Sequence, residues 1–192
     1  MRPVTLHTDR LELSVPTAGD VDAIFAACQD PEVQRYTTVP TPYRRAHAEG
    51  FVEKAAAWWD AGTETTWAVR RDGMLSGMVG LHRLGRGDGE LGYWMAPDAR
   101  GRGFLTEAAR AVVDWGFSPA EGERGLGLAR IEWRAVAGNI ASARAARALG
   151  FRYEGLLRQA LLHSSGRRDD AWIAGLLPGD DRTPQEWPVL AG

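Results

Sequence analysis

The sequence has a single cysteine, a single lysine and no long apolar run. Cys28 has no second cysteine to pair with, which excludes a disulfide within the chain and a cysteine metal site and favours a reducing compartment. No segment approaches the ~20 consecutive apolar residues that a membrane-spanning helix needs, and the N-terminal segment lacks the apolar core of a signal peptide. We therefore expect a soluble, cytoplasmic protein.

Charge and histidine content are also modest. The net charge is −2, so no global field attracts nucleic acid or an anionic membrane, and we expect direct binding to neither. The four histidines form no His-x-x-His motif and no ordered pair with a cysteine or a carboxylate, which predicts no metal site. The sequence contains no Gly-x-Ser-x-Gly motif, which argues against a serine hydrolase.

With 192 residues, 44% of them hydrophobic and 25% charged, the chain suits one globular domain. Strands and helices are predicted from the spacing of apolar residues, from the hairpin signal Asp72-Gly73, and from the helix caps Asn139 and Gly150. Pro42 is well placed for a first helical turn. The expected strands are 10–15, 65–70, 75–84, 90–95, 129–136, 151–162 and 171–177, and the expected helices follow Thr17 or lie at about 42–61, 104–117 and 139–149.

The most informative stretch is a strand-turn-helix segment at 89–117. Arg100-Gly101-Arg102-Gly103 brings backbone N–H groups and two arginines to the first turn of the helix, where the helix dipole favours an anion such as a diphosphate. No Gly-Lys-Ser/Thr is present, which excludes a Walker-type loop, and Thr106 stands where a dinucleotide motif would have its third glycine. The alternative is a structural strand-to-helix turn with surface arginines.

This stretch resembles the pyrophosphate motif of the GNAT acyltransferase superfamily, Arg/Gln-x-x-Gly-x-Gly/Ala. Arg100 and Gly103 match the motif, and Leu105 occupies the slot usually taken by glycine or alanine. The larger leucine leaves less room beside a diphosphate.

A second motif resembles the same superfamily. Asn139-x-x-Ser142, followed after one helix by Gly150-Phe151, is similar to the family's Asn-x-x-Ser and Gly-Phe elements. Gly-Tyr-Trp at 92–94 and Asp-x-Trp-x-x-x-Leu at 170–176 resemble the RimJ/RimL branch, which acetylates N-terminal amines of ribosomal proteins, and related small-amine acetyltransferases. The resemblance covers residues 8–177.

The resemblance implies the GNAT fold, an α/β (α+β) arrangement with a mixed central sheet of about six to seven strands flanked by about four helices. It implies one domain over residues 1–177 and acetyl-CoA as the coenzyme. The prolines and Asp180-Asp181 of the tail at 178–192 predict that this segment is poorly structured. The coenzyme-binding residues implied by the matching positions are Trp94, Met95, Arg100, Gly101, Arg102, Gly103, Phe104, Leu105, Thr106, Asn139, Ser142 and Arg144.

Acyl transfer to an amine needs a base, a site for the oxyanion and an acid for the leaving thiolate. The resemblance implies Glu90 as the base, the freed backbone N–H at a bulge near Met95 as the oxyanion donor, and Ser142 as the acid. It also implies that Asn139 bonds the pantetheine amide. The alternatives are that Glu90 is a solvated strand-end residue and that Ser142 is an ordinary first-turn residue of its helix.

The acceptor is least constrained by the sequence. The resemblance implies an N-acetyltransferase that acts on a primary amine, with a protein N-terminal α-amine preferred. A small amine such as a polyamine or aminoglycoside is the nearest alternative, and a coenzyme A-binding module without turnover is the alternative from another class. We expect a homodimer, with some of five tryptophans at an interface or in the acceptor cleft: Trp58, Trp59, Trp67, Trp133 and Trp172.

Overall fold

The computed structural model describes residues 1–121, 125–163 and 166–191. These residues form one mixed sheet of eight strands in the order β1-β2-β3-β4-β5-β6-β8-β7, together with five α-helices. The strands are β1 (Leu6–His7), β2 (Glu12–Ser14), β3 (Thr65–Arg71), β4 (Met74–Gly85), β5 (Asp88–Met95), β6 (Arg130–Val136), β7 (Arg152–Leu162) and β8 (Arg168–Leu176). The helices are α1 (Val21–Ala27), α2 (Pro31–Tyr36), α3 (Arg45–Ala61), α4 (Phe104–Phe117) and α5 (Ile140–Ala148).

This architecture confirms the expected mixed α/β fold, with slightly more strands than predicted because the two-residue β1 adds an edge strand. No helix in the described part of the chain is long and apolar enough to cross a membrane. The Ser164-Ser165-Gly166 turn expected between the last two strands lies partly outside the described residues.

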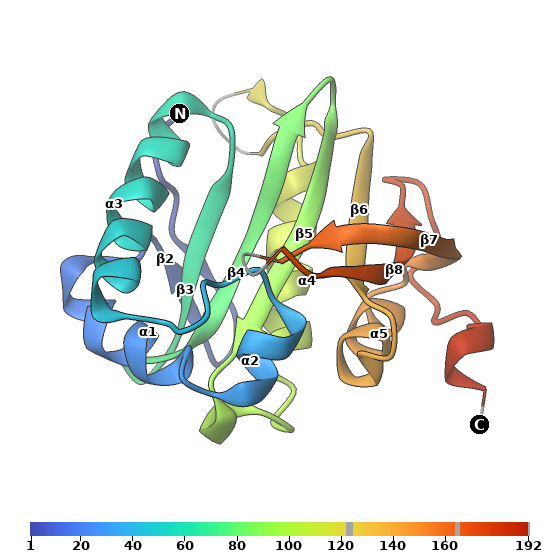
Figure 1. The fold of residues 1–192 in the computed structure, drawn as a ribbon. Coiled ribbons are helices and arrows are strands. Elements are labelled where there is room, and N and C mark those ends of the chain that lie inside the picture. The colour runs from blue at the N-terminus through green and yellow to red at the C-terminus, as the bar shows by residue number, and fades with distance from the viewer. Residues whose placement is uncertain (122–124, 164–165, 192) are drawn as a thin grey trace.

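The sheet separates two hydrophobic clusters. The larger cluster contains the inner faces of α4 and α5, and the smaller one contains α1, Val33 of α2 and the first half of α3. Figure 1 shows α1, α2 and α3 on the near side of the sheet, called the front face below, and α4 behind it. Trp94 packs with the front cluster, whereas its neighbour Met95 belongs to the rear one, as the alternation of a strand requires.

The two central strands β5 and β6 separate part-way along their length. They pair in parallel only from Asp88↔Arg130 to Leu91↔Trp133. Beyond that rung β5 continues beside β4, and β6 continues beside β8. The sheet therefore opens between Gly92–Met95 and the end of β6. The expected bulge at Met95 is not present, because the β4–β5 register is regular from Gly77↔Met95 to His82↔Glu90.

Helix α3 begins at Arg45, so the prediction that Pro42 opens this helix is wrong. Arg44 is extended and forms the N-cap, and its N–H donates to His47 Nδ1 at 3.0 Å. This side-chain cap satisfies an N–H that the helix cannot, so it sets the first residue.

The five tryptophans expected at an interface or cleft are mostly core residues. Trp59 and Trp67 are fully buried and pack edge to face at 4.8 Å, and Trp133 and Trp172 are also buried. Trp133 additionally borders the opening between β5 and β6. The tryptophans therefore give no support to a homodimer.

The C-terminal segment, expected to be poorly structured, packs against the domain. Trp187 is only 1% exposed, and its indole N–H donates to Phe151 O at 3.2 Å. Its ring also contacts Trp133, with 5.5 Å between centroids. Arg182 pairs with Asp114 of α4 at 3.2 Å. Trp187, with Val189 and Leu190 packed against the same core, thus anchors a segment whose composition predicted poor structure.

We predict that Trp187→Ala destabilises the protein by about 3–5 kcal/mol, because it removes a large buried ring and leaves a cavity beside Trp133. Chemical denaturation monitored by circular dichroism measures the change. Trp187→Phe is the matched control, since it keeps most of the apolar volume and loses the bond to Phe151 O, and it should cost less. A loss below about 1 kcal/mol for the alanine variant would show that the segment is not part of the core.

Candidate active site

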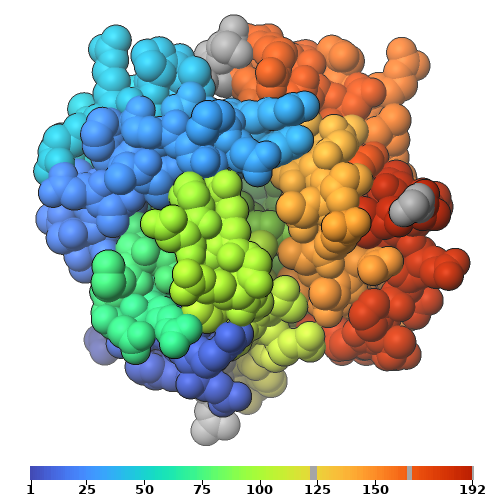
Figure 2. Space-filling model, turned by 90° about the horizontal axis from the view of Figure 1, so that it is seen from below, coloured from blue at the N-terminus to red at the C-terminus, as the bar shows by residue number. Residues whose placement is uncertain are grey.

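A cavity of about 460 Å³ lies where β5 and β6 separate. In Figure 2 a recess opens between α2, the turn that leads into α4, and α5. Eleven of the residues predicted to bind the coenzyme line this cavity: Trp94, Met95, Arg100, Gly101, Gly103, Phe104, Leu105, Thr106, Asn139, Ser142 and Arg144. Arg102 and Glu90 are not among the lining residues. The structure thus brings together two motifs that lie about 40 residues apart in the chain.

The N-terminus of α4 is open to this cavity. Gly103 is the N-cap with φ of 77°, and it has no side chain to satisfy the first N–H groups of the helix. Gly101 also has a left-handed φ, 72°, which explains why glycine occupies both positions. The first turn of α4 therefore presents backbone donors and the positive end of its dipole to the cavity.

Residues distant in sequence brace this turn from outside. Arg10 donates to the carbonyl of Arg102 at 3.1 Å, and its guanidinium lies 4.9 Å from the centre of the Phe104 ring. Arg10 is held in turn by Glu107 at 2.6 Å, and Thr8 donates to the same carboxylate. Sequence analysis missed these residues, since their partners lie more than 90 positions away and no local pattern marks them.

Arg100 connects the turn to α2. Its guanidinium donates to Asp30 Oδ1 at 2.6 Å and to Met95 O at 3.2 Å. The hydrogen bond from Arg100 is the main reason that the pKa of Asp30 lies below its ordinary value of 3.8. Asp30 also caps α2, so one carboxylate fixes both the helix and the arginine. The Arg100 side chain is thus already engaged within the protein.

Ser142 lies at the first turn of α5, behind the opening. Asn139 Oδ1 accepts a hydrogen bond from Ser142 N at 3.1 Å, as an N-cap does. Ser142 Oγ accepts from Trp133 Nε1 at 3.1 Å and donates to Tyr93 Oη at 3.0 Å, while Tyr93 Oη donates to Ser142 O. Burial raises the pKa of Tyr93 to about 12 despite these hydrogen bonds, so the phenol is neutral.

Tyr93 and Trp133 were not predicted as site residues. Tyr93 belongs to the Gly-Tyr-Trp sequence that supported the family resemblance, but nothing in its spacing places it against Ser142, 49 residues away. The two aromatic side chains leave the Ser142 hydroxyl little rotational freedom.

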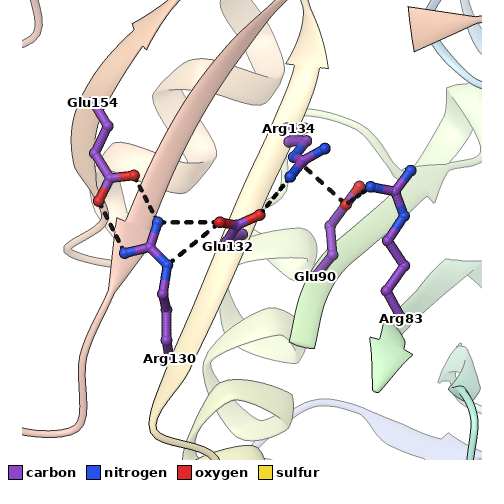
Figure 3. Close-up of polar contacts among 6 residues, drawn as sticks. All are labelled: Arg83, Glu90, Arg130, Glu132, Arg134 and Glu154. Carbon is purple, nitrogen blue, oxygen red and sulfur yellow. Dashed lines mark hydrogen bonds and ion pairs between the residues drawn. The ribbon is translucent and has the colours of Figure 1, made fainter. Parts of the chain in front are cut away.

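The front face beside the opening carries a ladder of alternating charges, which Figure 3 shows. Its members, in spatial order, are Arg83, Glu90, Arg134, Glu132, Arg130 and Glu154. Arg134 donates to Glu132 Oε2 at 2.8 Å, and Arg130 donates to Glu154 Oε2 at 2.6 Å. Partial burial alone would raise the pKa of Glu132, but the hydrogen bonds and charges of Arg134 and Arg130 outweigh it and lower the pKa.

Glu90 lies within this ladder rather than in open solvent. Its Oε2 atom is 3.1 Å from Arg83 Nη1 and 3.8 Å from Arg134 Nε, and the side chain is 18% exposed. Oε2 is buried and accepts no hydrogen bond from a described residue, so its contacts with the two arginines are ion pairs only. The alternative interpretation, a solvated strand-end glutamate, does not describe this geometry.

The expectation that no histidine pairs with a carboxylate is wrong. His82 Nδ1 lies 2.8 Å from Glu64 Oε2, and His163 Nε2 lies 2.9 Å from Asp169 Oδ2. No sequence motif marks either pair, whose members lie 18 and 6 positions apart. Among the described residues no cluster of histidine, cysteine and carboxylate side chains could hold a metal ion.

Comparisons with known proteins agree with this geometry. Residues 10–152 match the family model described as "Acetyltransferase (GNAT) domain". The chain is 35% identical over 158 residues to a Bacillus subtilis protein described as an uncharacterized N-acetyltransferase, YoaA, covering 80% of this chain and 86% of the relative.

Two solved structures share the fold at low identity. One is Mycobacterium smegmatis RimJ in complex with CoA-disulfide, with a TM-score of 0.81, 19% identity and coverage of 93% of this chain and 90% of that one. The other is RimL, described as ribosomal L7/L12 alpha-N-protein acetyltransferase and solved in complex with coenzyme A, with a TM-score of 0.78, 17% identity and coverage of 91% and 98%. With a matching family model over most of its length and a sheet that opens between two helix N-termini, the chain belongs to the GNAT acetyltransferase family.

Proposed function

We propose that the protein is an acetyl-CoA-dependent N-acetyltransferase whose acceptor is a primary amine, most suitably the α-amine of a protein N-terminus. The observation that carries this proposal is the cavity at the β5–β6 separation, into which the uncapped N-terminus of α4 opens. Bound there, acetyl-CoA would supply the activated acetyl group as a thioester.

The residues present fit such a coenzyme. The diphosphate would be held by the backbone donors of the first turn of α4, since the Arg100 side chain is occupied by Asp30. Gly103 leaves this turn unobstructed, because it has no side chain, and its φ of 77° is one that residues with a side chain rarely adopt. Arg144, at the opposite wall, adds a positive charge.

Unpaired backbone groups of β5 would bind the pantetheine arm. Ala96 N–H donates to Ser76 O of the neighbouring segment, at 2.9 Å. Because residues of an antiparallel pair alternate in the direction of their N–H groups, those of Met95 and Tyr93 point away from β4 and into the opening. These N–H groups are also the donors available to a thioester oxyanion. Asn139 uses its oxygen as a helix cap, which leaves its NH₂ group for a pantetheine carbonyl.

Ser142 is the proposed acid. Its hydroxyl lines the cavity and is held by Trp133 and Tyr93. To protonate a departing thiolate, Ser142 must redirect to the sulfur the proton that it donates to Tyr93 Oη. Tyr93 is partly buried and keeps its own proton, as its raised pKa of about 12 requires.

Transfer is proposed to be direct, without an acyl-enzyme. Cys28, the single cysteine, is buried in the front cluster, and burial raises the pKa of its thiol to about 11. A thiol that holds its proton so strongly in a closed environment is a poor nucleophile.

The resemblance implied Glu90 as the base, but its place between Arg83 and Arg134 suits its negative charge to attracting the ammonium form of the acceptor. It lies on the front face, at the last paired residues before β5 and β6 separate. The preference for a protein N-terminus rests on the likeness to RimJ and to RimL, the latter a ribosomal L7/L12 alpha-N-protein acetyltransferase.

A direct test of the function measures thiol release from acetyl-CoA against a panel of N-terminal peptides and small amines. We expect turnover with peptides. Turnover only with polyamines or aminoglycosides would change the acceptor class, and binding of acetyl-CoA without any turnover would indicate a binding module instead.

We predict that Gly103→Glu weakens acetyl-CoA binding at least tenfold. The substitution adds bulk and a negative charge at the helix N-terminus where donors face the diphosphate, and each charge-assisted bond lost is worth about 1.5 kcal/mol or more. Calorimetric titration of the folded variant measures the effect, with Gly73→Glu, at a surface turn where a Cβ meets nothing, as the matched control. Unchanged affinity would place the coenzyme elsewhere.

We predict that Glu90→Gln lowers kcat/KM for the acceptor by roughly 10²-fold and leaves acetyl-CoA affinity unchanged. A neutral amide does not attract an ammonium group to the front face. The loss should shrink as the pH rises, because more of the acceptor then arrives as free amine. A loss that is constant with pH would assign Glu90 a structural role in the ladder.

A further inference from the structure

His82 on β4 lies on the front face beside the active-site opening. It is the cross-strand partner of Glu90, so the two side chains project from the same face of the sheet. Its ring extends along the sheet over Gly92, where a Cβ would lie 2.7 Å from both Cδ2 and Nε2. Gly92 lines the cavity and follows the last paired residue of β5 and β6. The missing side chain at Gly92 thus leaves room for the Nε2 edge of the ring over a residue that lines the cavity, although His82 itself is not among the lining residues.

The second nitrogen of the ring is held by Glu64. The Nδ1–Oε2 distance is 2.8 Å, and an ionised carboxylate can only accept a hydrogen bond, so Nδ1 carries the proton. Nε2 is then an acceptor with a free lone pair, and it has no hydrogen-bond partner among the described residues. A carboxylate that fixes the tautomer of a histidine in this way is the arrangement of a general base.

Glu90 is differently placed. Its Oε2 atom faces Arg83 and Arg134, so its charge is shared with two guanidinium groups that the ladder holds in position. His82 faces no arginine or lysine in the described contacts, and its side chain is 33% exposed. The ladder therefore suits Glu90 to electrostatic attraction, whereas the free lone pair of His82 suits it to proton transfer.

We propose that His82, oriented by Glu64, is the general base that removes the proton from the acceptor ammonium, while Glu90 attracts that ammonium to the front face. The proposal rests on the acetyl transfer proposed above. An N–H bond of the ammonium breaks, its electron pair stays on nitrogen for attack on the thioester carbonyl, and the proton bonds to Nε2. Glu64 stabilises the resulting imidazolium, and the exposed ring edge returns the proton to water.

The test compares His82→Gln and His82→Ala with wild type in the thiol-release assay. We expect kcat to fall roughly 10²-fold in both variants while acetyl-CoA affinity stays unchanged. Added imidazole should restore at least a tenth of the lost kcat to His82→Ala, because a diffusible base can occupy the vacated space. His7→Gln, at an exposed position of β1, is the matched control and should behave as wild type.

Two further variants separate the roles of the neighbouring carboxylates. Glu64→Gln should lower kcat with less effect on acceptor KM, since it acts only through His82. Glu90→Gln should raise acceptor KM, and imidazole should not restore its activity. Imidazole rescue is a result that a structural role for His82 would not produce.

Failure of this inference is distinguishable from failure of the proposed function. If wild type turns over and His82→Gln stays within twofold of it, or His82→Ala loses activity that imidazole does not restore, His82 is not the base and the acetyltransferase function stands. If wild type binds acetyl-CoA but acetylates no amine in the panel, the proposed function fails and the role of His82 fails with it.

Discussion

Strand β5 is hydrogen-bonded to β6 along only half its length. The other half has backbone groups without a partner on β6, and the site is built around them. An unpaired strand inside a sheet is unfavourable unless its polar groups find other partners. Here the N-termini of α4 and α5 and the free edge of β5 all present donors to the same opening. A ligand that has amide groups along its length and a diphosphate at its end can accept hydrogen bonds from all of these donors.

The site keeps its shape through contacts from remote parts of the chain. Arg10 and Glu107 fix the turn before α4 from one side, and Arg100 with Asp30 fixes it from the other. Trp187 packs against Trp133, whose indole in turn orients the Ser142 hydroxyl. The N-terminal segment between β1 and β2 and the C-terminal segment thus both contribute to preorganising the cavity, which lowers the ordering that a bound ligand must impose.

The ladder on the front face alternates three arginines with three glutamates, so its positive and negative charges cancel. Partly exposed ion pairs are individually weak, but a row of alternating charges holds each member in one orientation. Arg130 reaches Glu154 across β8 only because Gly175 has no side chain there, since a Cβ would collide with both groups. In the same way, the absence of a side chain at Gly92 leaves room for the ring of His82. Glycine inside a strand usually weakens it, but Gly175 and Gly92 determine which polar groups meet on this face.

The sequence alone predicted the features that depend on local order. Apolar periodicity, the Asp72-Gly73 turn and the Asn139 and Gly150 caps located most of the strands and helices, and Gly101 and Gly103 marked the open helix terminus, because backbone conformation is decided by near neighbours. The tertiary structure decided what depends on side chains that meet across the fold. In the folded chain Arg100 donates to Asp30, and Glu90 lies among arginines. Ser142 bonds to Tyr93, His82 bonds to Glu64, and Trp187 is buried. Such pairs join residues 7 to 70 positions apart, and their meeting is set by strand register and helix packing, which no short motif encodes.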